Sequence, residues 1–157
     1  MAKENCVQIK DKLIDLSRVK AIKYLDCEIY KEYEVIVIYE DGTKLIECED
    51  VSDTHKTFKQ LKTAVSDFAN QTKNLILIGN GTVNYGHKLI SVEDIEKLYI
   101  QTAKDYQHNR LGYAVNILFN NRSKEEIFFE THLEAERLYH SIDAKIESFE
   151  SDKIFNR

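Results

Sequence analysis

The chain has 157 residues, enough for one domain of ordinary size or for two small ones. Hydrophobic residues make up 43% of it and charged residues 31%, a balance that is typical of a globular protein and excludes a disordered one. The formal net charge of −5 argues against nucleic acid as a partner, because a phosphate backbone is bound by basic surfaces.

Two features predict a cytoplasmic protein that does not enter a membrane. The sequence contains no apolar run approaching about 18 residues, and its first residues, MAKENCVQIK, contain no apolar signal region. The three cysteines lie within predicted strands, without the spacing of a metal-binding or redox motif. Their odd number favours reduced thiols in a reducing compartment.

The first half begins with short strand-like segments. Residues 5–9 and 12–16 predict a hairpin that turns at Lys10-Asp11, and a further strand is expected over 19–27. The alternating, β-branched run 33–39 predicts the strongest strand of this half, with Tyr33, Val35, Val37 and Tyr39 facing the core.

The first half ends in a helix. Asp41-Gly42 is a hairpin signal, so residues 43–49 should return as the partner strand. The apolar period then changes from two to about 3.6, with a stripe made by Phe58, Leu61, Val65 and Phe68. Ser52 is the expected N-cap of this helix.

The second half shows the same order of patterns. Strands are expected at 75–78, 82–85, 88–90, 95–102, 113–119 and 125–130. Thr131 and Glu134 form the sequence of a capping box. The helix that follows has an apolar stripe made by Leu138, Ile142, Ile146 and Phe149, and we expect it to fray from Asp152.

The similarity of the halves extends to residue identity. Lys12-Leu13-Ile14 recurs as Lys88-Leu89-Ile90, 76 residues later. We therefore expect an α+β fold made by tandem duplication of a β-rich unit, with about five antiparallel strands followed by one helix. The first repeat would span 1–72 and the second 73–157. Because each half alone would bury only a thin core, the two are expected to pack as one compact unit with pseudo-two-fold symmetry.

In hydrophobic pattern, each half resembles two known kinds of domain. Pleckstrin-homology-like domains share the closing helix after antiparallel strands, and LytTR-type DNA-binding domains share a strand of the form I-x-x-I-x-x-I. The resemblance involves the opening K-L-I-x-[L/V]-x-x-[V/I]-x-x-[I/L] and the strands and helix after it. It transfers no residue of known role to this chain, and the acidic charge balance departs from that of a DNA-binding domain.

The candidate binding residues lie at two predicted hairpin tips. The connection 103–112 is four residues longer than its counterpart in the first half, so it is expected to be a surface loop. It contains Tyr106, His108 and Arg110, and Tyr30 and Tyr33 occupy the matching tip. Exposed aromatic residues beside arginine are typical of interaction hot spots. The alternative, that these tyrosines only cover the edge of a sheet, is equally consistent with the sequence.

Metal and catalytic patterns are weak. His132, Glu136 and His140 are spaced four apart on the second predicted helix, but they lack the H-E-x-x-H order of a zinc site, so we expect neither a metal nor a cofactor. The sequence contains no nucleophile motif such as G-x-S-x-G.

The sequence therefore predicts a non-catalytic, cytoplasmic binding or adaptor protein. It would act through its hairpin tips and the crevice between its repeats, on another protein or a second copy of itself. One alternative is a nucleic-acid-binding regulator, which would need basic residues gathered on one face, including Lys20, Lys23, Lys31 and Arg110. Another is a small hydrolase or transferase at the repeat junction, which would need a pocket containing a histidine or cysteine of shifted pKa, with His55 and His87 as the histidines to replace.

Overall fold

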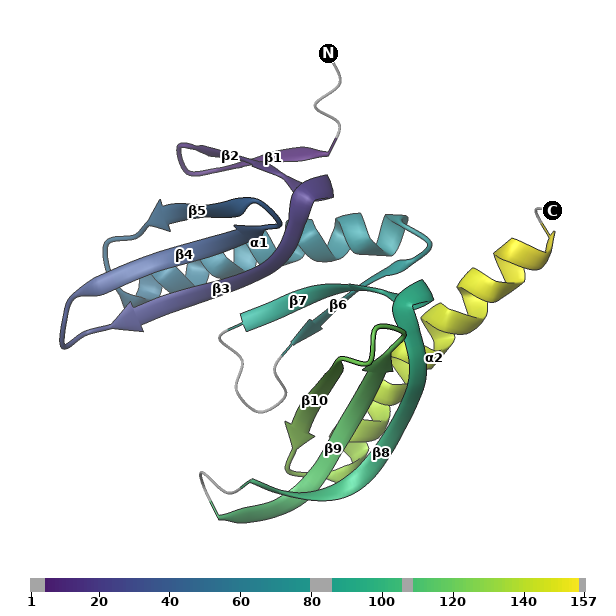
Figure 1. Ribbon diagram of the computed structural model, residues 1–157. Helices are drawn as coiled ribbons and strands as arrows, with labels where there is room; N and C mark the ends of the chain where they lie inside the picture. Colours follow the sequence, from purple (N-terminus) through teal and green to yellow (C-terminus); the bar gives the residue numbers. More distant parts are fainter. Residues whose placement is uncertain (1–4, 80–85, 106–108, 156–157) are drawn as a thin grey trace. The chain divides into compact units, whose positions relative to one another are not determined.

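The structure is a computed structural model that describes residues 5–79, 86–105 and 109–155 (Figure 1). The fold is α+β, with β-rich sheets and two α-helices among these residues. It divides into two compact units, the first made of Met1–Thr72 and Tyr85–Leu89, the second of Lys73–Asn84 and Ile90–Arg157. Neither helix, over its described residues, has the apolar length that a membrane crossing requires.

The first unit contains most of a sheet and the helix that covers it. Its elements are β1 (Cys6–Ile9), β2 (Lys12–Asp15), the short 3-10 helix η1 (Leu16–Arg18), β3 (Val19–Cys27), β4 (Glu32–Tyr39), β5 (Gly42–Glu47) and α1 (Val51–Gln71). The strands β1 and β2 form a separate antiparallel hairpin, which turns at Lys10-Asp11 as predicted. In Figure 1, α1 lies behind β3 and β4, on one face of their sheet.

The sheet of the first unit also contains a strand from much later in the chain. Five strands form it, in the order β5-β4-β3-β7-β6, where β6 is Leu75–Gly79 and β7 is Gly86–Ser91. β7 runs antiparallel to β3, with Ala21, Ile22 and Lys23 opposite residues 88, 87 and 86. One edge of β3 is thus paired with its sequence neighbour β4 and the other with a strand about 65 residues away.

The core of the first unit confirms the predicted periodicities. Val35 and Val37 are fully buried, as are Leu61 and Val65 on α1. A pleated strand directs alternate side chains to one face, and residues three or four apart share one face of a helix. The alternating strand and the helical stripe therefore bury the same apolar core between them.

The predicted N-cap of α1 is wrong by two residues. Asp50 is the cap, and its carboxylate accepts a hydrogen bond from the backbone N–H of Asp53 at 2.7 Å. Ser52 already lies within the first turn of the helix. Both residue types suit a cap, and Asp50 lies where the chain leaves β5 in extended conformation.

The second unit contains its own antiparallel sheet and helix. Its elements are β6, the end of β7, the short 3-10 helix η2 (Val92–Asp94), β8 (Ile95–Asp105), β9 (Arg110–Phe119), β10 (Lys124–Phe129) and α2 (His132–Phe155). The three strands β10-β9-β8 form one sheet in that order. Val115 and Ile117 on β9 are fully buried with Ile142 of α2, as the alternation in 113–119 predicts. The predicted strand 82–85 lies outside the described residues.

The expected loop 103–112 is shorter than predicted. Ala103 pairs with Gly112, and Asp105 pairs with Arg110, so both ends of that segment belong to β8 and β9. The additional residues of this connection extend the β8–β9 ladder. Their backbone N–H and C=O groups are thus hydrogen-bonded between the strands, whereas in a loop they would be hydrogen-bonded to water.

Gly112 lies where β9 and β10 approach closely. A Cβ built on Gly112 would be 2.4 Å from the backbone oxygen of Phe129 and 2.6 Å from Cζ of Phe128. Both distances are far below van der Waals contact. Only a residue without a side chain therefore fits this position of β9.

The predicted cap of α2 by Thr131 is confirmed, but the Glu134 carboxylate bonds the Thr131 hydroxyl and not its backbone N–H, as a full capping box would. The backbone N–H of Glu134 donates to the Thr131 hydroxyl oxygen at 3.2 Å, and that hydroxyl donates to the Glu134 carboxylate at 2.8 Å. The far end of the helix differs from the prediction, because α2 continues through Asp152 to Phe155.

Replacing Thr131 with alanine should lower the free energy of unfolding by about 1 kcal/mol, because the cap hydroxyl is lost. Urea denaturation followed by circular dichroism would measure this change. Thr131→Ser is the matched control, since it keeps the hydroxyl and should unfold within about 0.5 kcal/mol of the wild type. Equal midpoints for the alanine and serine variants would contradict the role of the cap.

Candidate functional site

The tip of the β3–β4 hairpin exposes two large apolar side chains. β3 and β4 remain paired as far as Cys27 and Glu32, and the turn between them is closed by the Lys31 N–H, which donates to the Glu28 carbonyl at 3.3 Å. At this tip Ile29 is 87% exposed and Tyr30 is 75% exposed. We call Ile29 and Tyr30 the apolar tip.

Tyr33, the other candidate of this half, is separate from the apolar tip. It is half-buried, and its backbone carbonyl accepts a hydrogen bond from the N–H of Cys48 at 2.9 Å. Burial raises the pKa of its phenol, and the carboxylate of Glu28 raises it further. Tyr33 therefore contributes to the sheet, whereas Tyr30 is available to a partner.

The second candidate tip is described in part. Arg110 is exposed at the start of β9 and forms an ion pair with Glu130. Leu111 beside it is 81% exposed. Tyr106 and His108 lie outside the described residues, so their predicted place beside Arg110 stays a prediction.

Sequence reasoning missed Ile29 and Leu111. Both are apolar residues beside a turn. Hydrophobic periodicity cannot predict whether an isolated apolar residue is buried or exposed, because such a residue belongs to no repeating pattern. A signal was present in the sequence, because Ile29 stands between Glu28 and Tyr30 in a segment expected to be a turn.

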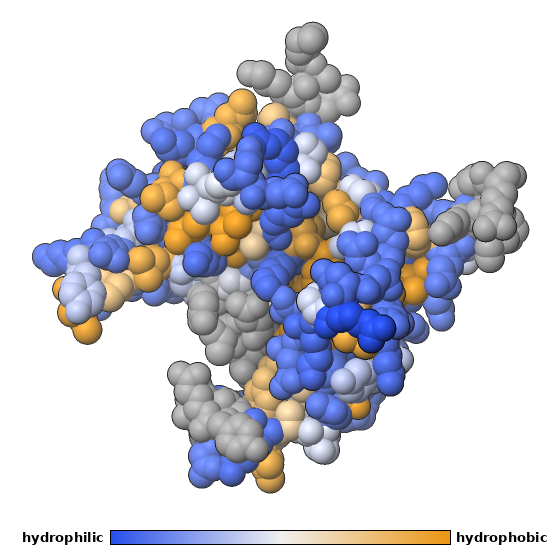
Figure 2. All heavy atoms as spheres, viewed as in Figure 1, coloured by the Kyte–Doolittle hydropathy of each residue, from blue (hydrophilic) through white to orange (hydrophobic). Residues whose placement is uncertain are grey.

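The face of the first sheet that lies away from α1 is also apolar. Val35 and Val37 point into the core, so Ile36 and Ile38 point to the opposite face, where they are half-buried. Leu45 lies opposite Ile36 in the ladder and is 46% exposed. Figure 2 shows hydrophobic residues gathered over these strands.

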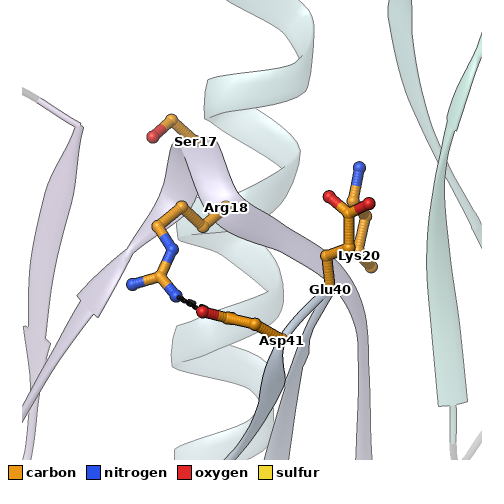
Figure 3. A pocket seen from close by; sticks show the side chains of 5 residues that line it. All are labelled: Ser17, Arg18, Lys20, Glu40 and Asp41. Carbon is orange, nitrogen blue, oxygen red and sulfur yellow. Dashed lines mark hydrogen bonds and ion pairs between the residues drawn. The ribbon is translucent and has the colours of Figure 1, made fainter.

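The surroundings of Lys20 do not favour a phosphate ligand. A pocket of about 300 Å³ contains Lys20 and Arg18 together with the carboxylates of Glu40 and Asp41 (Figure 3). Arg18 Nη2 donates to both carboxylate oxygens of Asp41, at 2.7 and 2.9 Å, and its guanidinium lies over the Tyr39 ring. An anion in this pocket would meet two carboxylates, so the pocket lacks the excess positive charge of a nucleic-acid interface.

His55, one of the two histidines considered for catalysis, links α1 to β3. Its Nε2 lies 2.7 Å from a carboxylate oxygen of Asp26, and its ring packs edge-on against Tyr24. A carboxylate that holds an imidazole in this way also occurs in hydrolases, where the imidazole activates a nucleophile. In this chain the contact joins the first helix to the end of the β3 strand.

His87 has the shifted pKa that the enzyme alternative required, but it lies in the core. It is 7% exposed on β7, against the ring of Phe58. The pKa of His87 falls from 6.5 to about 4, mainly because the imidazole is buried and secondly because the charge of Lys62 is nearby. Its Nδ1 is buried without a hydrogen-bond partner. The shift is explained by packing in the core, where a substrate would not reach the imidazole.

The described residues contain no group of three or more histidine, cysteine or acidic side chains that could hold a metal ion. His132 instead pairs with the carboxylate of Glu136 through Nδ1, and the ring of His140 packs against Tyr139.

Comparisons with protein-family models, with curated proteins and with solved structures find no match to this chain. The resemblance to pleckstrin-homology-like domains therefore has no support from a structural neighbour.

Proposed function

We propose that this chain is a non-catalytic binding protein that engages a protein partner through its apolar tip. The observation that carries this proposal is the exposure of Ile29 and Tyr30, at 87% and 75%, at the end of a hairpin. An isoleucine and a tyrosine side by side give a partner apolar area together with a hydroxyl for orientation.

The geometry of the hairpin supports this role. The ladder between β3 and β4 runs to the turn, so the apolar tip is held in place before a partner arrives. Less conformational entropy is then lost on binding. Fully burying an apolar side chain such as isoleucine contributes about 1.5–3 kcal/mol, from which the entropic cost of association is subtracted.

We also propose that the chain arose by tandem duplication. The order of elements supports this, because a hairpin, a 3-10 helix, three strands and an α-helix occur twice in succession. The recurring Lys-Leu-Ile triplet lies within β2 the first time and within β7 the second time. The β8–β9 hairpin, with Leu111 exposed, would then be the second copy of the binding hairpin.

The cytoplasm is the proposed place of action. Cys6, Cys27 and Cys48 are free thiols, each half-buried. Free thiols persist in a reducing compartment.

The double variant Ile29→Ser/Tyr30→Ser tests the apolar tip. Immobilised wild-type and variant protein would be exposed to native cell extract, and the captured proteins quantified by mass spectrometry. We expect at least one captured protein to fall about tenfold or more with the variant, since hot-spot residues each cost more than about 1 kcal/mol.

Leu133→Ser is the matched control for this experiment. Leu133 is an exposed apolar residue on α2, so its replacement removes exposed apolar surface at a different place. The control should capture the same proteins as the wild type. The same captured set at the same amounts from the tip variant would overturn the proposed function.

A further inference from the structure

The outer edge of β8 is the longest strand edge that the described residues leave unpaired. β8 has 11 residues, and no other described strand at the edge of a sheet has more than 6. In the first sheet, β7 covers the edge of β3 that faces away from β4. Within the described residues, no strand covers the edge of β8 that faces away from β9. Long unpaired edges attract other strands, and proteins commonly cover or interrupt them.

The ladder shows which backbone groups β8 directs outward. The N–H of Phe119 donates to the Ser123 carbonyl at 2.9 Å, which makes that pair hydrogen-bonded. Bonded and non-bonded pairs alternate along an antiparallel ladder, so every second residue of β9 from Ile117 back to Tyr113 bonds to β10. The β8 residues opposite these direct their N–H and C=O groups away from β9, and they are Leu98, Ile100 and Thr102. None of the three has another hydrogen bond within the part of the chain that the structure describes.

The middle of β8 has no feature that protects an edge. Residues 98–103, LYIQTA, contain no charged side chain, no proline and no glycine. The bulge in this strand lies before them, between Ile95 and Lys97. The apolar Leu98 and Ile100 pack on the core of the second unit and are only half-buried there. A strand added at this edge would bury both side chains further and bond the outward backbone groups.

We propose that β8 pairs, antiparallel, with β8 of a second copy of this chain. Two sheets of three strands would then form one continuous sheet in the order β10-β9-β8-β8-β9-β10. The same edge serves on both copies, so the contact is closed by a two-fold axis and leaves no further edge to extend. That axis is perpendicular to the sheet, so the α2 helices, each packed on one face of its own sheet (Figure 1), would lie on the same face of the joined sheet.

The hydrogen-bonding direction of β8 restricts the register of this pairing. In an antiparallel ladder, a residue that directs its groups towards the partner strand lies opposite another residue that does so. In β8 these are the even-numbered residues from Leu98 to Thr102, so even-numbered residues must lie opposite even-numbered ones. A register that sets Lys97 opposite Lys104 would pair odd with even and is therefore excluded.

One allowed register matches both charge and apolar character. With Ile100 opposite Ile100 of the second copy, Leu98 lies opposite Thr102 and Glu96 comes beside Lys104, each on both sides of the axis. Glu96 and Lys104 are exposed and carry opposite charges, and such cross-strand pairs are stabilising. The next allowed register would instead set Lys104 opposite the apolar Leu98. The strand is therefore complementary to itself, which is why a second copy is the occupant that we infer.

The mass of the protein in solution tests the pairing. Light scattering coupled to gel filtration should give the wild type twice the 18.4 kDa mass of one chain. Thr102→Pro removes an outward N–H at an exposed position and leaves the hydrogen bonds to β9 in place, so this variant should elute at 18.4 kDa. Thr102→Val is the matched control, because it keeps the N–H and should remain dimeric. A wild type of monomeric mass, or a folded Thr102→Pro variant that is still dimeric, would overturn the proposal.

Charge reversal tests the register. Lys104→Glu and Glu96→Lys each bring like charges together at both ends of the contact, so each should raise the dissociation constant of the dimer about tenfold. In an equal mixture of the two variants, the acidic side chains of one meet the basic side chains of the other at both ends. The mixture should therefore regain the wild-type dissociation constant, measured by sedimentation equilibrium over a dilution series. A mixture no tighter than either variant alone would reject the proposal.

Two controls keep these tests independent. Lys124→Glu makes the same charge change on β10, at the far edge of the sheet, and should leave the dissociation constant unchanged. If circular dichroism shows Thr102→Pro unfolded, the charge reversals decide, because Glu96 and Lys104 are exposed and their variants should fold. The tip variant Ile29→Ser/Tyr30→Ser should keep the dimeric mass, so loss of partner binding and loss of assembly are distinguishable.

Discussion

Lowering the pH from 6.5 to 4 is expected to reduce the free energy of unfolding by about 3 kcal/mol through His87 alone. The imidazole is 7% exposed, and its pKa falls from 6.5 to about 4 because it is buried against Phe58 with Lys62 nearby. Within this window the unfolded chain binds a proton at His87 and the folded chain does not. The contribution of neutral His87 to the free energy of unfolding is therefore fully present above pH 6.5. It is lost progressively as the pH falls towards 4.

Urea denaturation at several pH values would measure this loss, and the variant His87→Leu would isolate it. Leucine at position 87 has no group that can bind a proton. The free energy of unfolding of the variant should therefore fall less steeply than that of the wild type as the pH is lowered from 6.5 to 4. His140→Gln is the control for replacing a histidine as such, because His140 is exposed on α2 and not buried in the core. Equal slopes for His87→Leu and the wild type would show that His87 is not buried as a neutral base.

Replacing Gly112 with alanine should lower the free energy of unfolding of the second unit by about 3 kcal/mol. The added Cβ would lie 2.4 Å from the backbone oxygen of Phe129, which is fixed in the β9–β10 ladder, and 2.6 Å from the Phe128 ring. Relief would require the two strands to separate. Hydrogen exchange of the β10 amides, together with the urea midpoint, would measure the effect.

Leu111→Ala is the control for this substitution. Leu111 precedes Gly112 on the same strand and is 81% exposed, so its truncation should change stability by no more than about 0.5 kcal/mol. The double variant Gly112→Ala/Phe128→Leu should recover only part of the loss, because the Phe129 oxygen remains. Full recovery would locate the strain in the ring and not in the backbone.

The order and type of the elements were predictable because burial on one face repeats with a fixed period. Val35 and Val37 alternate with half-buried neighbours, and Leu61 and Val65 lie one turn apart on α1. Nothing in this pattern determines where a strand ends. For this reason the pairing of Asp105 with Arg110, which extends the β8–β9 ladder into the segment expected to be a loop, was not predicted.

Long-range pairing was beyond prediction for a different reason. The contact of Ile22 with His87 depends on which edge is open when the fold forms, and no local propensity encodes that. The burial of His87 follows from the same contact. Of the two exposed residues at the β3–β4 tip, Tyr30 was a candidate because of its aromatic type, whereas the more exposed Ile29 was not considered because apolar residues are normally assigned to the core.

The pairing of β7 with β3 has a consequence for the order of events during biosynthesis. A ribosome must translate past Lys88 before the edge of β3 near Ala21 can be covered. Until then the edge of β3 in the nascent amino-terminal half is unpaired, and it can form non-native contacts with other strands, such as those of neighbouring nascent chains. Truncation after Thr72 would make that transient exposure permanent, so a fragment with those bounds should be prone to aggregate.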